Sequence, residues 1–144
     1  MNDHMQAFHH TAISVRDLDI SLTFYQKLGF VKTNHYRADD NSLHIVQLSL
    51  GGVGLEIFWY LSNQMAEKLQ LEYANNLEQI GVKHIGLKVK NLDDTRKWLI
   101  SLGFADENTE INIARSLANS RYLFIQDPDE MGVEFIEDNR SKVG

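Results

Sequence analysis

The stretch HHTAISVRDLDISLTFYQKLGF, residues 9–30, returns later in the chain as KHIGLKVKNLDDTRKWLISLGF, residues 83–104. The two stretches align without a gap at a constant offset of 74 residues, which places His84 at the position of His10. Both close on the tripeptide LGF, so a chance match is not credible. The period exceeds that of solenoid repeats, and there are only two copies. The sequence therefore predicts a duplicated module and not a repeat array.

Each copy starts with a run in which apolar and other residues alternate, as in a strand, and continues with the pattern of an amphipathic helix. The runs HTAISV and HIGLKV, at 10–15 and 84–89, predict half-buried strands. Apolar residues then recur at helical spacing, and Gly29 or Gly103 follows as a C-terminal cap. The helical positions are Leu18, Leu22, Tyr25 and Leu28 in the first copy and Leu92, Leu99 and Leu102, with the polar Arg96 between them, in the second.

Three more strands are expected after each helix. They are predicted at 30–38, 43–50 and 53–60 in the first copy and at about 104–106, 120–126 and 131–137 in the second. The predicted fold is therefore α+β, one domain over residues 1–144 made of two tandem β-α-β-β-β modules at about 8–60 and 82–137. Residues 61–81 join the modules and are expected to be partly helical. Met65, Leu69 and Tyr73 form a packing stripe there, and a role for it in covering a pocket is less favoured.

Composition narrows the classes of function. A length of 144 residues suits one domain with a real core, and the formal net charge of −6 with a pI of about 5.4 argues against a nucleic-acid partner. No apolar run is long enough to span a membrane, and the N-terminus lacks the zones of a secretory signal, so a cytoplasmic location is expected. There is no cysteine, which leaves His, Asp and Glu as the side chains that could hold a metal.

Strand alternation singles out one histidine of the adjacent pair at 9 and 10. Alternate side chains of a strand point to opposite faces, so His10 shares a face with Ala12 and Ser14, away from the side that covers the helix. His84 takes the same place in the second copy. His9 is expected to point the other way. It is read, like the histidines at 4, 35 and 44, as an ordinary surface or core residue.

Two glutamates lie in strands that are otherwise apolar. Glu56 stands in VGLEIFWY and Glu134 in GVEFIE, 46 and 50 residues after the histidine of the same copy. A carboxylate in such a strand is costly to bury unless something pairs with it. The two modules are therefore expected to contribute one His and one Glu each to a site. Two imidazoles with two carboxylates suit Zn, Ni, Co, Fe or Mn and disfavour Ca or Mg.

With these features the sequence resembles the vicinal oxygen chelate superfamily, which includes glyoxalase I, bleomycin and fosfomycin resistance proteins, extradiol dioxygenases and methylmalonyl-CoA epimerase. The resemblance extends over residues 8–137 and is strongest at 9–30, at KHIGLKVKN and at DPDEMGVEFIE. It implies curved mixed sheets around a metal cavity, often in a dimer. It also implies that one divalent ion, Ni, Co or Zn before Fe or Mn, is bound by His10, Glu56, His84 and Glu134. This set of ligands is most similar to that of bacterial glyoxalase I.

Two positions depart from the glutathione-using glyoxalases that the chain resembles. Those enzymes usually carry an Arg and an Asn where this chain has Ser14 and Tyr60, and loss of the Arg removes a charge-assisted contact. Glutathione is therefore not the expected thiol. Phe58 and Tyr60 are candidates for lining the pocket, and Lys88 shares the face of His84, where it could pair with an anionic substrate or simply be solvated.

The resemblance implies a lyase or isomerase that acts on a hemithioacetal or another α-oxygenated carbonyl. The metal would polarise the carbonyl and stabilise an enediolate, with Glu134 as the base and Glu56 as its mirror partner. Two alternatives remain open: another metalloenzyme, such as a dioxygenase or an antibiotic-modifying thiol transferase, and a metal-free drug-binding protein. Edge strands of each module must pair or be covered, so a homodimer is expected, with a small-molecule substrate as its other partner.

Overall fold

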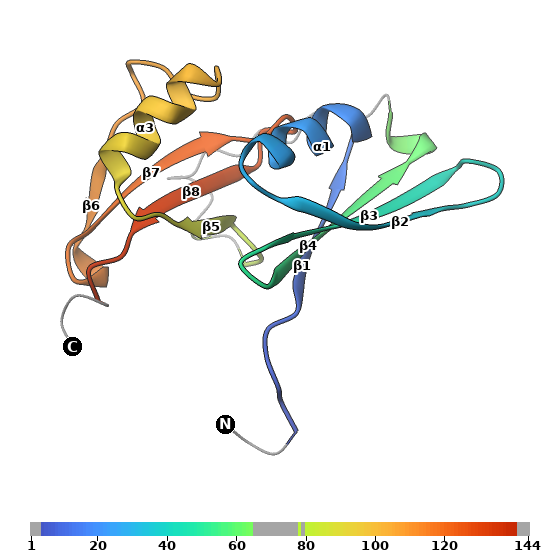
Figure 1. Ribbon diagram of the computed structural model, residues 1–144, viewed down its shortest axis with the longest axis horizontal. Coiled ribbons are helices and arrows are strands. Elements are labelled where there is room, and N and C mark those ends of the chain that lie inside the picture. Colours follow the sequence, from blue (N-terminus) through green and yellow to red (C-terminus); the bar gives the residue numbers. More distant parts are fainter. Residues whose placement is uncertain (1–3, 65–77, 79, 141–144) are drawn as a thin grey trace. The chain divides into compact units, whose positions relative to one another are not determined.

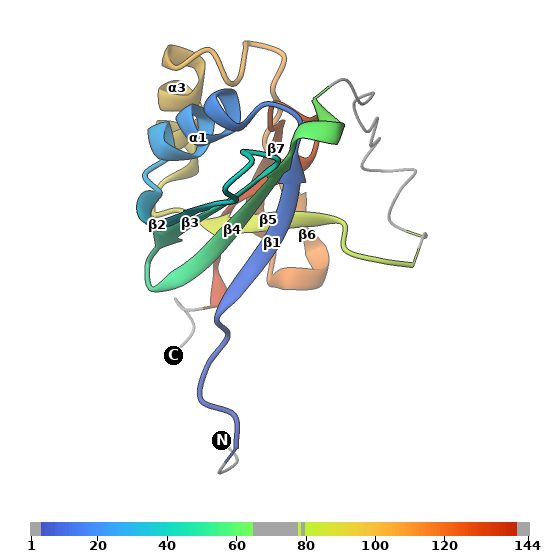
Figure 2. The same cartoon turned by 90° about the vertical axis from the view of Figure 1, so that its right-hand side faces the viewer.

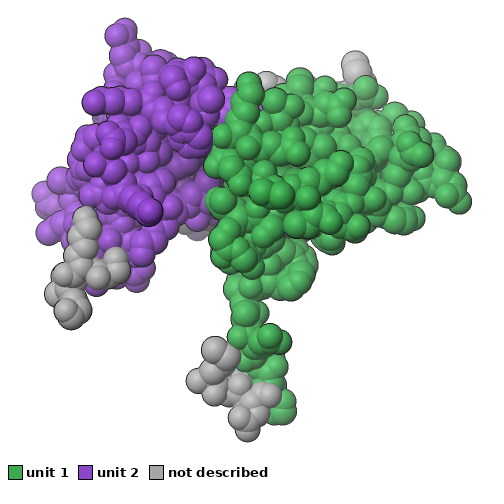
Figure 3. All heavy atoms as spheres, in the orientation of Figure 1, with its two compact units in different colours: residues 1–68 green, residues 69–144 purple. Residues whose placement is uncertain are grey.

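The computed structural model describes residues 4–64, 78 and 80–140. The chain divides into two compact units, residues 1–68 and 69–144, each drawn in its own colour in Figure 3. Each unit holds one four-stranded mixed sheet. Among the described residues, no helix has both the length and the apolar character needed to cross a membrane.

The first unit contains the helix α1, the strands β1 to β4 and a short 3-10 turn. In chain order its elements are β1 (His10–Val15), α1 (Leu18–Lys27), β2 (Val31–Arg37), β3 (Leu43–Leu50), β4 (Val53–Tyr60) and the 3-10 turn Leu61–Asn63. The strand order across the sheet is β1-β4-β3-β2, with β1 parallel to β4 and the other pairs antiparallel. Figures 1 and 2 show β1 alongside β4, with α1 on one side of the sheet.

The second unit repeats this plan. Its elements are β5 (His84–Lys88), α3 (Leu92–Ser101), β6 (Asn112–Ala114), the 3-10 turn Arg115–Leu117, β7 (Ser120–Gln126) and β8 (Gly132–Glu137). The strand order is β5-β8-β7-β6, and β5 runs parallel to β8. The predicted α+β fold of two repeated modules is therefore confirmed.

Both helices begin and end as the sequence indicates. The side chain of Asp17 accepts a hydrogen bond from the backbone N–H of Ile20, and that of Asn91 accepts one from Asp94, which satisfies N–H groups that have no partner inside the helix. Gly29 and Gly103 follow the helices with φ of 110° and 77°, a left-handed conformation that other residues adopt at a cost. The loops that lead into β2 and towards β6 start at these glycines.

One face of each sheet is buried and the opposite face is not. In the first unit Tyr25 of α1, Val46 of β3 and Ile57 of β4 are fully buried. Along β1, residues 10, 12 and 14 are exposed while 11 and 13 are half-buried and Val15 is buried, which confirms the predicted alternation. In the second unit the fully buried apolar residues are Leu92, Leu99, Leu123 and Val133. The predicted ligands lie on the opposite, less buried face of each sheet. These are His10 and Glu56 in the first sheet and His84 and Glu134 in the second.

One predicted strand is wrong. Residues 104–106 are not a strand; β6 instead lies at Asn112–Ala114. The intervening residues form a turn in which Asp106 and Thr109 bond to each other through backbone and side chain, and Arg96 of α3 donates to the carbonyl of Thr109 at 2.7 Å. This local bonding replaces the ladder that a strand would need. In the segment 61–81, Leu61–Asn63 is a 3-10 turn, and the predicted stripe Met65, Leu69 and Tyr73 lies outside the described residues.

Candidate metal centre

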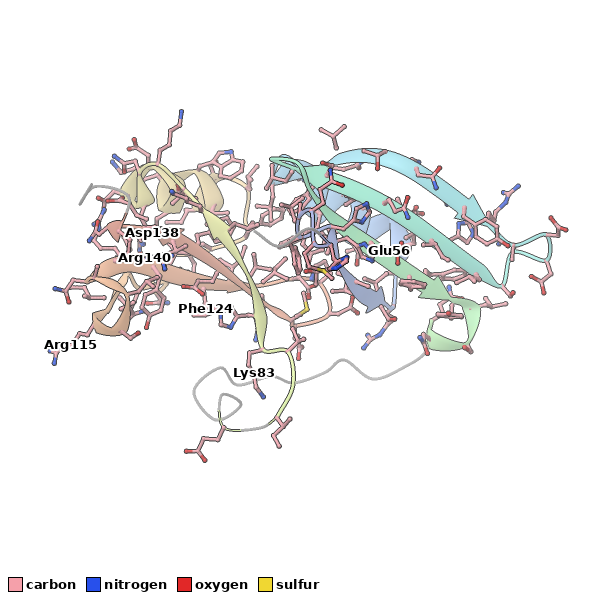
Figure 4. The ribbon with its side chains drawn as sticks, turned by 90° about the horizontal axis from the view of Figure 1, so that it is seen from below. Glu56, Lys83, Arg115, Phe124, Asp138 and Arg140 are labelled. Carbon is pink, nitrogen blue, oxygen red and sulfur yellow. The ribbon has the colours of Figure 1, made fainter. Side chains whose placement is uncertain are left out.

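His10 and Glu56 lie on the same face of the first sheet, on neighbouring strands. His10 of β1 is opposite Gly54 of β4, and Glu56 follows two residues later, so strand alternation points both side chains the same way. Nε2 of His10 lies 3.8 Å from Oε1 of Glu56. The carboxylate is 16% exposed and the imidazole 40%, so this pair lies at the edge of a hollow and not in the core. Figure 4 labels Glu56 on its strand.

His84 and Glu134 form the corresponding pair in the second unit. His84 of β5 is opposite Gly132 of β8, again two residues before the glutamate. Nε2 of His84 lies 2.8 Å from Oε2 of Glu134, and both side chains are largely shielded from solvent. The two modules thus repeat the same register and the same pairing of donor atoms.

The structure brings the four predicted ligands together as two pairs, one in each unit. Nowhere in residues 4–64, 78 and 80–140 does a group of three or more His, Cys, Asp or Glu gather in a way that could hold a metal ion. Each pair supplies one imidazole nitrogen and one carboxylate oxygen, which are donor types that suit a borderline divalent ion. A cavity of about 300 Å³ lies beside the first pair, lined by His10, Gln47, Gly54 and Glu56 among others.

Gln47 is a residue that the sequence analysis missed. It stands opposite Glu56 across β3 and β4, and its side-chain Nε2 donates to Oε2 of Glu56 at 2.8 Å. The bond is partly buried. A signal was present in the sequence, because the two-residue turn Gly51–Gly52 fixes which residues of the hairpin face each other.

His9 was predicted to point away from His10, and this prediction is wrong. The two Nδ1 atoms lie 2.7 Å apart and the rings meet edge to face with centroids 5.0 Å apart. His9 precedes the first residue of β1, so strand alternation does not apply to it. Its carbonyl also accepts a hydrogen bond from the backbone N–H of Gly54 at 2.8 Å. His9 therefore contacts the candidate ligand beside it.

The second pair has an aromatic setting. Phe124 of β7 stands opposite Glu134 of β8, and its ring meets that of His84 edge to face with centroids 4.9 Å apart. Tyr122 continues the row, with its ring centroid 5.8 Å from that of Phe124. Figure 4 labels Phe124 in this unit. The position that holds a carboxamide in the first module thus holds a phenyl ring in the second.

Three of the four predicted pocket residues cluster on the first sheet. Ser14 of β1 is opposite Phe58 of β4, and the rings of Phe58 and Tyr60 are stacked with centroids 6.4 Å apart. They share the face of His10 and Glu56. Trp59 faces the other way, where its indole N–H donates to the carbonyl of Arg16 at 2.9 Å. At the end of β4, the sheet face that carries His10 and Glu56 therefore presents aromatic rings and hydroxyl groups.

Lys88, the fourth predicted pocket residue, is the exposed last residue of β5. The pKa of Asp138 is lowered to about 2, mainly by hydrogen bonds from Arg140. The positive charge of Lys88 makes the smallest contribution to this shift. Figure 4 shows Asp138 and Arg140 close together. Lys88 thus has an anionic side chain of its own chain nearby.

The family model for the Glyoxalase/Bleomycin resistance protein/Dioxygenase superfamily matches residues 7–135. The chain belongs to this superfamily. The superfamily includes glyoxalase I lyases as well as proteins that are not enzymes. Among curated proteins, none matches the chain.

Solved structures of this superfamily share the fold. The chain is 29% identical to the protein SMU.1112c, with a TM-score of 0.77 over 92% of this chain and 99% of that one. It is 18% identical to lactoylglutathione lyase from Agrobacterium tumefaciens (TM-score 0.61, covering 94% and 96% of the two chains). It is 14% identical to the fosfomycin resistance protein FosX from Listeria monocytogenes, solved with Mn(II) and sulfate (TM-score 0.63, 99% and 98%).

Proposed function

We propose that His10, Glu56, His84 and Glu134 together bind one divalent metal ion in a glyoxalase-like lyase or isomerase. One observation carries the proposal: both copies of a duplicated module bring an imidazole Nε2 and a carboxylate oxygen together, at the same register on the same kind of sheet face. A single His–Glu pair would be an ordinary surface contact. Its repetition argues for a site built from both copies, whether of one chain or of two chains in a homodimer.

The proposed substrate is a small molecule with a carbonyl next to an oxygen-bearing carbon, such as a hemithioacetal. When bound, a divalent ion supplies Lewis-acid chemistry, which makes the C–H beside a carbonyl more acidic. Glu134 accepts that proton on a carboxylate oxygen and returns it to the adjacent carbon, so the substrate is isomerised without net gain or loss of a proton. The phenyl ring of Phe124 packs edge to face against the imidazole of His84 in this pair.

The first sheet argues for a thiol other than glutathione. Ser14, Phe58 and Tyr60 offer hydroxyl groups and ring faces where a carboxylate-bearing thiol would need a cation. A thiol with a neutral or aromatic portion fits this surface better. The alternative enzymes of the superfamily, dioxygenases and antibiotic-modifying transferases, would be distinguished by oxygen consumption or by modification of the drug.

The test is the metal content per chain of untagged protein refilled with Ni, Co, Zn, Mn or Fe(II), compared with His84→Ala. About one tightly held ion per chain in the wild type, lost in the variant, is expected. Isomerase assays with a panel of thiols then follow on the loaded protein. A wild type that retains none of these ions, or a His84→Ala variant that retains them equally, would overturn the proposal.

A further inference from the structure

The two His–Glu pairs occupy equivalent places in their modules but have different neighbours. The residue opposite Glu56 in the adjoining antiparallel strand is Gln47, and the residue opposite Glu134 is Phe124. One glutamate therefore faces a hydrogen-bond donor and the other faces a phenyl ring. The parallel strand on the other side differs as well, since Ala12 is opposite Glu56 and Gly86 is opposite Glu134.

The first pair is held from outside by two polar side chains. The amide of Gln47 donates to Oε2 of Glu56 at 2.8 Å, which leaves Oε1 as the oxygen nearest to His10. Nδ1 of His10 is engaged by Nδ1 of His9 at 2.7 Å, which leaves Nε2 as the ring nitrogen nearest to Glu56. In both Glu56 and His10, one polar atom is bonded to a neighbouring side chain and the other lies nearest to the opposite member of the pair. Such outer contacts restrict the orientation of metal ligands.

The second pair has more freedom around its glutamate. Within the described residues, His84 is the polar partner that the structure gives Glu134, at 2.8 Å. A Cβ added at Gly86 would lie 3.9 Å from Oε2 of Glu134, so the space beside the carboxylate is open as long as residue 86 is glycine. The phenyl ring of Phe124 offers no hydrogen bond to hold the carboxylate in place.

We infer that Gln47, supported by His9, is a positioning residue that makes the first pair the rigid, ligand-holding half of the centre. Glu134 is left as the carboxylate that can move. This division deepens the proposed function and rests on it. A base that is also a ligand must loosen its hold on the metal during each turnover, while the other ligands keep the ion in place. The different partners of the two glutamates meet those two requirements.

The first test replaces Gln47 with methionine, which has nearly the same length and shape but no amide donor. Kd for Co(II) and Ni(II) would be measured by competition with a chelator, together with the visible spectrum of the Co(II) protein and the Tm of the metal-free protein. About tenfold weaker binding and an altered Co(II) spectrum are expected, since loss of an outer contact typically costs at least that much affinity. The metal-free Tm should stay near the wild-type value.

Gln26→Met is the matched control, because Gln26 is an exposed residue of α1 whose side chain is not in the candidate centre. Its Kd and Co(II) spectrum should equal those of the wild type. If the wild type binds one ion per chain and Gln47→Met binds it equally well with an unchanged spectrum, this inference fails while the proposed function stands. If the wild type retains no ion, the proposed function itself fails.

The second test restricts the movement of Glu134 with Gly86→Ala. The added methyl would make an ordinary van der Waals contact with the carboxylate, so the variant should fold and bind the ion with wild-type affinity. Its kcat should fall several-fold with little change in KM. An unchanged kcat, or a loss of metal affinity without a loss of kcat, would contradict the assignment of Glu134 as the mobile half.

Discussion

His10 and Gly54 stand opposite each other across β1 and β4 with no room for a side chain at position 54. A Cβ built on Gly54 would lie 2.9 Å from the Cβ of His10, closer than Cβ atoms approach other atoms in proteins, and at a tight 3.1 Å from the carbonyl oxygen of His9. The glycine therefore allows β1 to lie near enough for His10 to reach Glu56. The candidate centre depends on this close approach as well as on its ligands.

Gly54→Ala is expected to displace His10 and to weaken metal binding. Overpacking of this kind typically costs about 1–3 kcal/mol of stability. Chemical unfolding of the metal-free protein and chelator competition would measure the two effects. Gly86→Ala is the control for stability, because its added Cβ would meet its nearest neighbour at 3.9 Å. Equal stability of the two variants would show that the contact at Gly54 is not limiting.

Glu134→Gln is expected to retain much of the metal and to lose most of the isomerase activity, by about 10²- to 10⁴-fold, the usual contribution of a general base. A carboxamide can still offer an oxygen to a cation but cannot accept the substrate proton. Single-turnover assays at saturating metal would measure the loss. Full activity in this variant would exclude Glu134 as the base and would direct the search to Glu56.

The hairpin β2–β3 carries a chain of hydrogen bonds that should make stability depend on pH. Lys32 lies 3.3 Å from Nδ1 of His35, and Nε2 of His35 lies 2.8 Å from Nδ1 of His44. Nε2 of His44 lies 2.6 Å from Oδ1 of Asn41. The ammonium group of Lys32 can only donate, so Nδ1 of His35 is the acceptor and the proton of this ring is on Nε2. A second proton on His35 would occupy Nδ1 and break the bond to Lys32.

The pKa of His35 is lowered by burial first, and then by the positive charges of Lys32, His44 and Arg37. A histidine with a lowered folded-state pKa binds its proton more weakly than in the unfolded chain. The stability from this residue is therefore complete above the unfolded value of about 6.5 and is lost as the pH falls through the folded-state pKa. Urea unfolding at several pH values should show a steeper dependence in this range for the wild type than for His35→Gln. Identical slopes would contradict it.

Arg121 of β7 connects the start of α3 to the end of β8. Its guanidinium lies 2.9 Å from Asp93 and 3.1 Å from Glu137, and Glu137 also accepts the backbone N–H of Leu92 at 2.8 Å. Arg121→Met should lower stability by at most about 1 kcal/mol, because one end of this network is exposed. The loss should shrink at high salt, and metal affinity should not change. A variant that loses metal affinity would mean that this network also supports the centre.

Much of the fold could be predicted because the sequence contains the same module twice, and each copy supports the interpretation of the other. The alignment of His10 with His84 located both first strands, and the apolar spacing before Gly29 and Gly103 located both helices. The strand predicted at 104–106 was wrong because Phe104 and Ala105 are apolar enough to suggest one. The turn that forms there instead depends on hydrogen bonds of Asp106, Thr109 and Arg96, and Arg96 is distant in the sequence.

The sequence pattern pairs each candidate histidine with a glutamate of the same module, but it was not used to find the residues that contact these pairs. Gln47 could have been found, since the residue numbers of each cross-strand pair in the Gly51–Gly52 hairpin add up to 103, which assigns position 47 to Glu56. The orientation of His9 could not, because it lies just before the first strand, where the period of two no longer applies.

The length of the turn at Gly51–Gly52 constrains how the residue at position 47 can vary among related proteins. Because it places position 47 opposite position 56, the glutamine nine residues before the glutamate is useful only while the turn keeps its length. Descendants of the same ancestor that gained or lost one residue in this turn would bring a different side chain to the carboxylate. We therefore expect turn length and glutamine to be inherited together, so that lineages with an altered turn no longer carry a carboxamide at that distance.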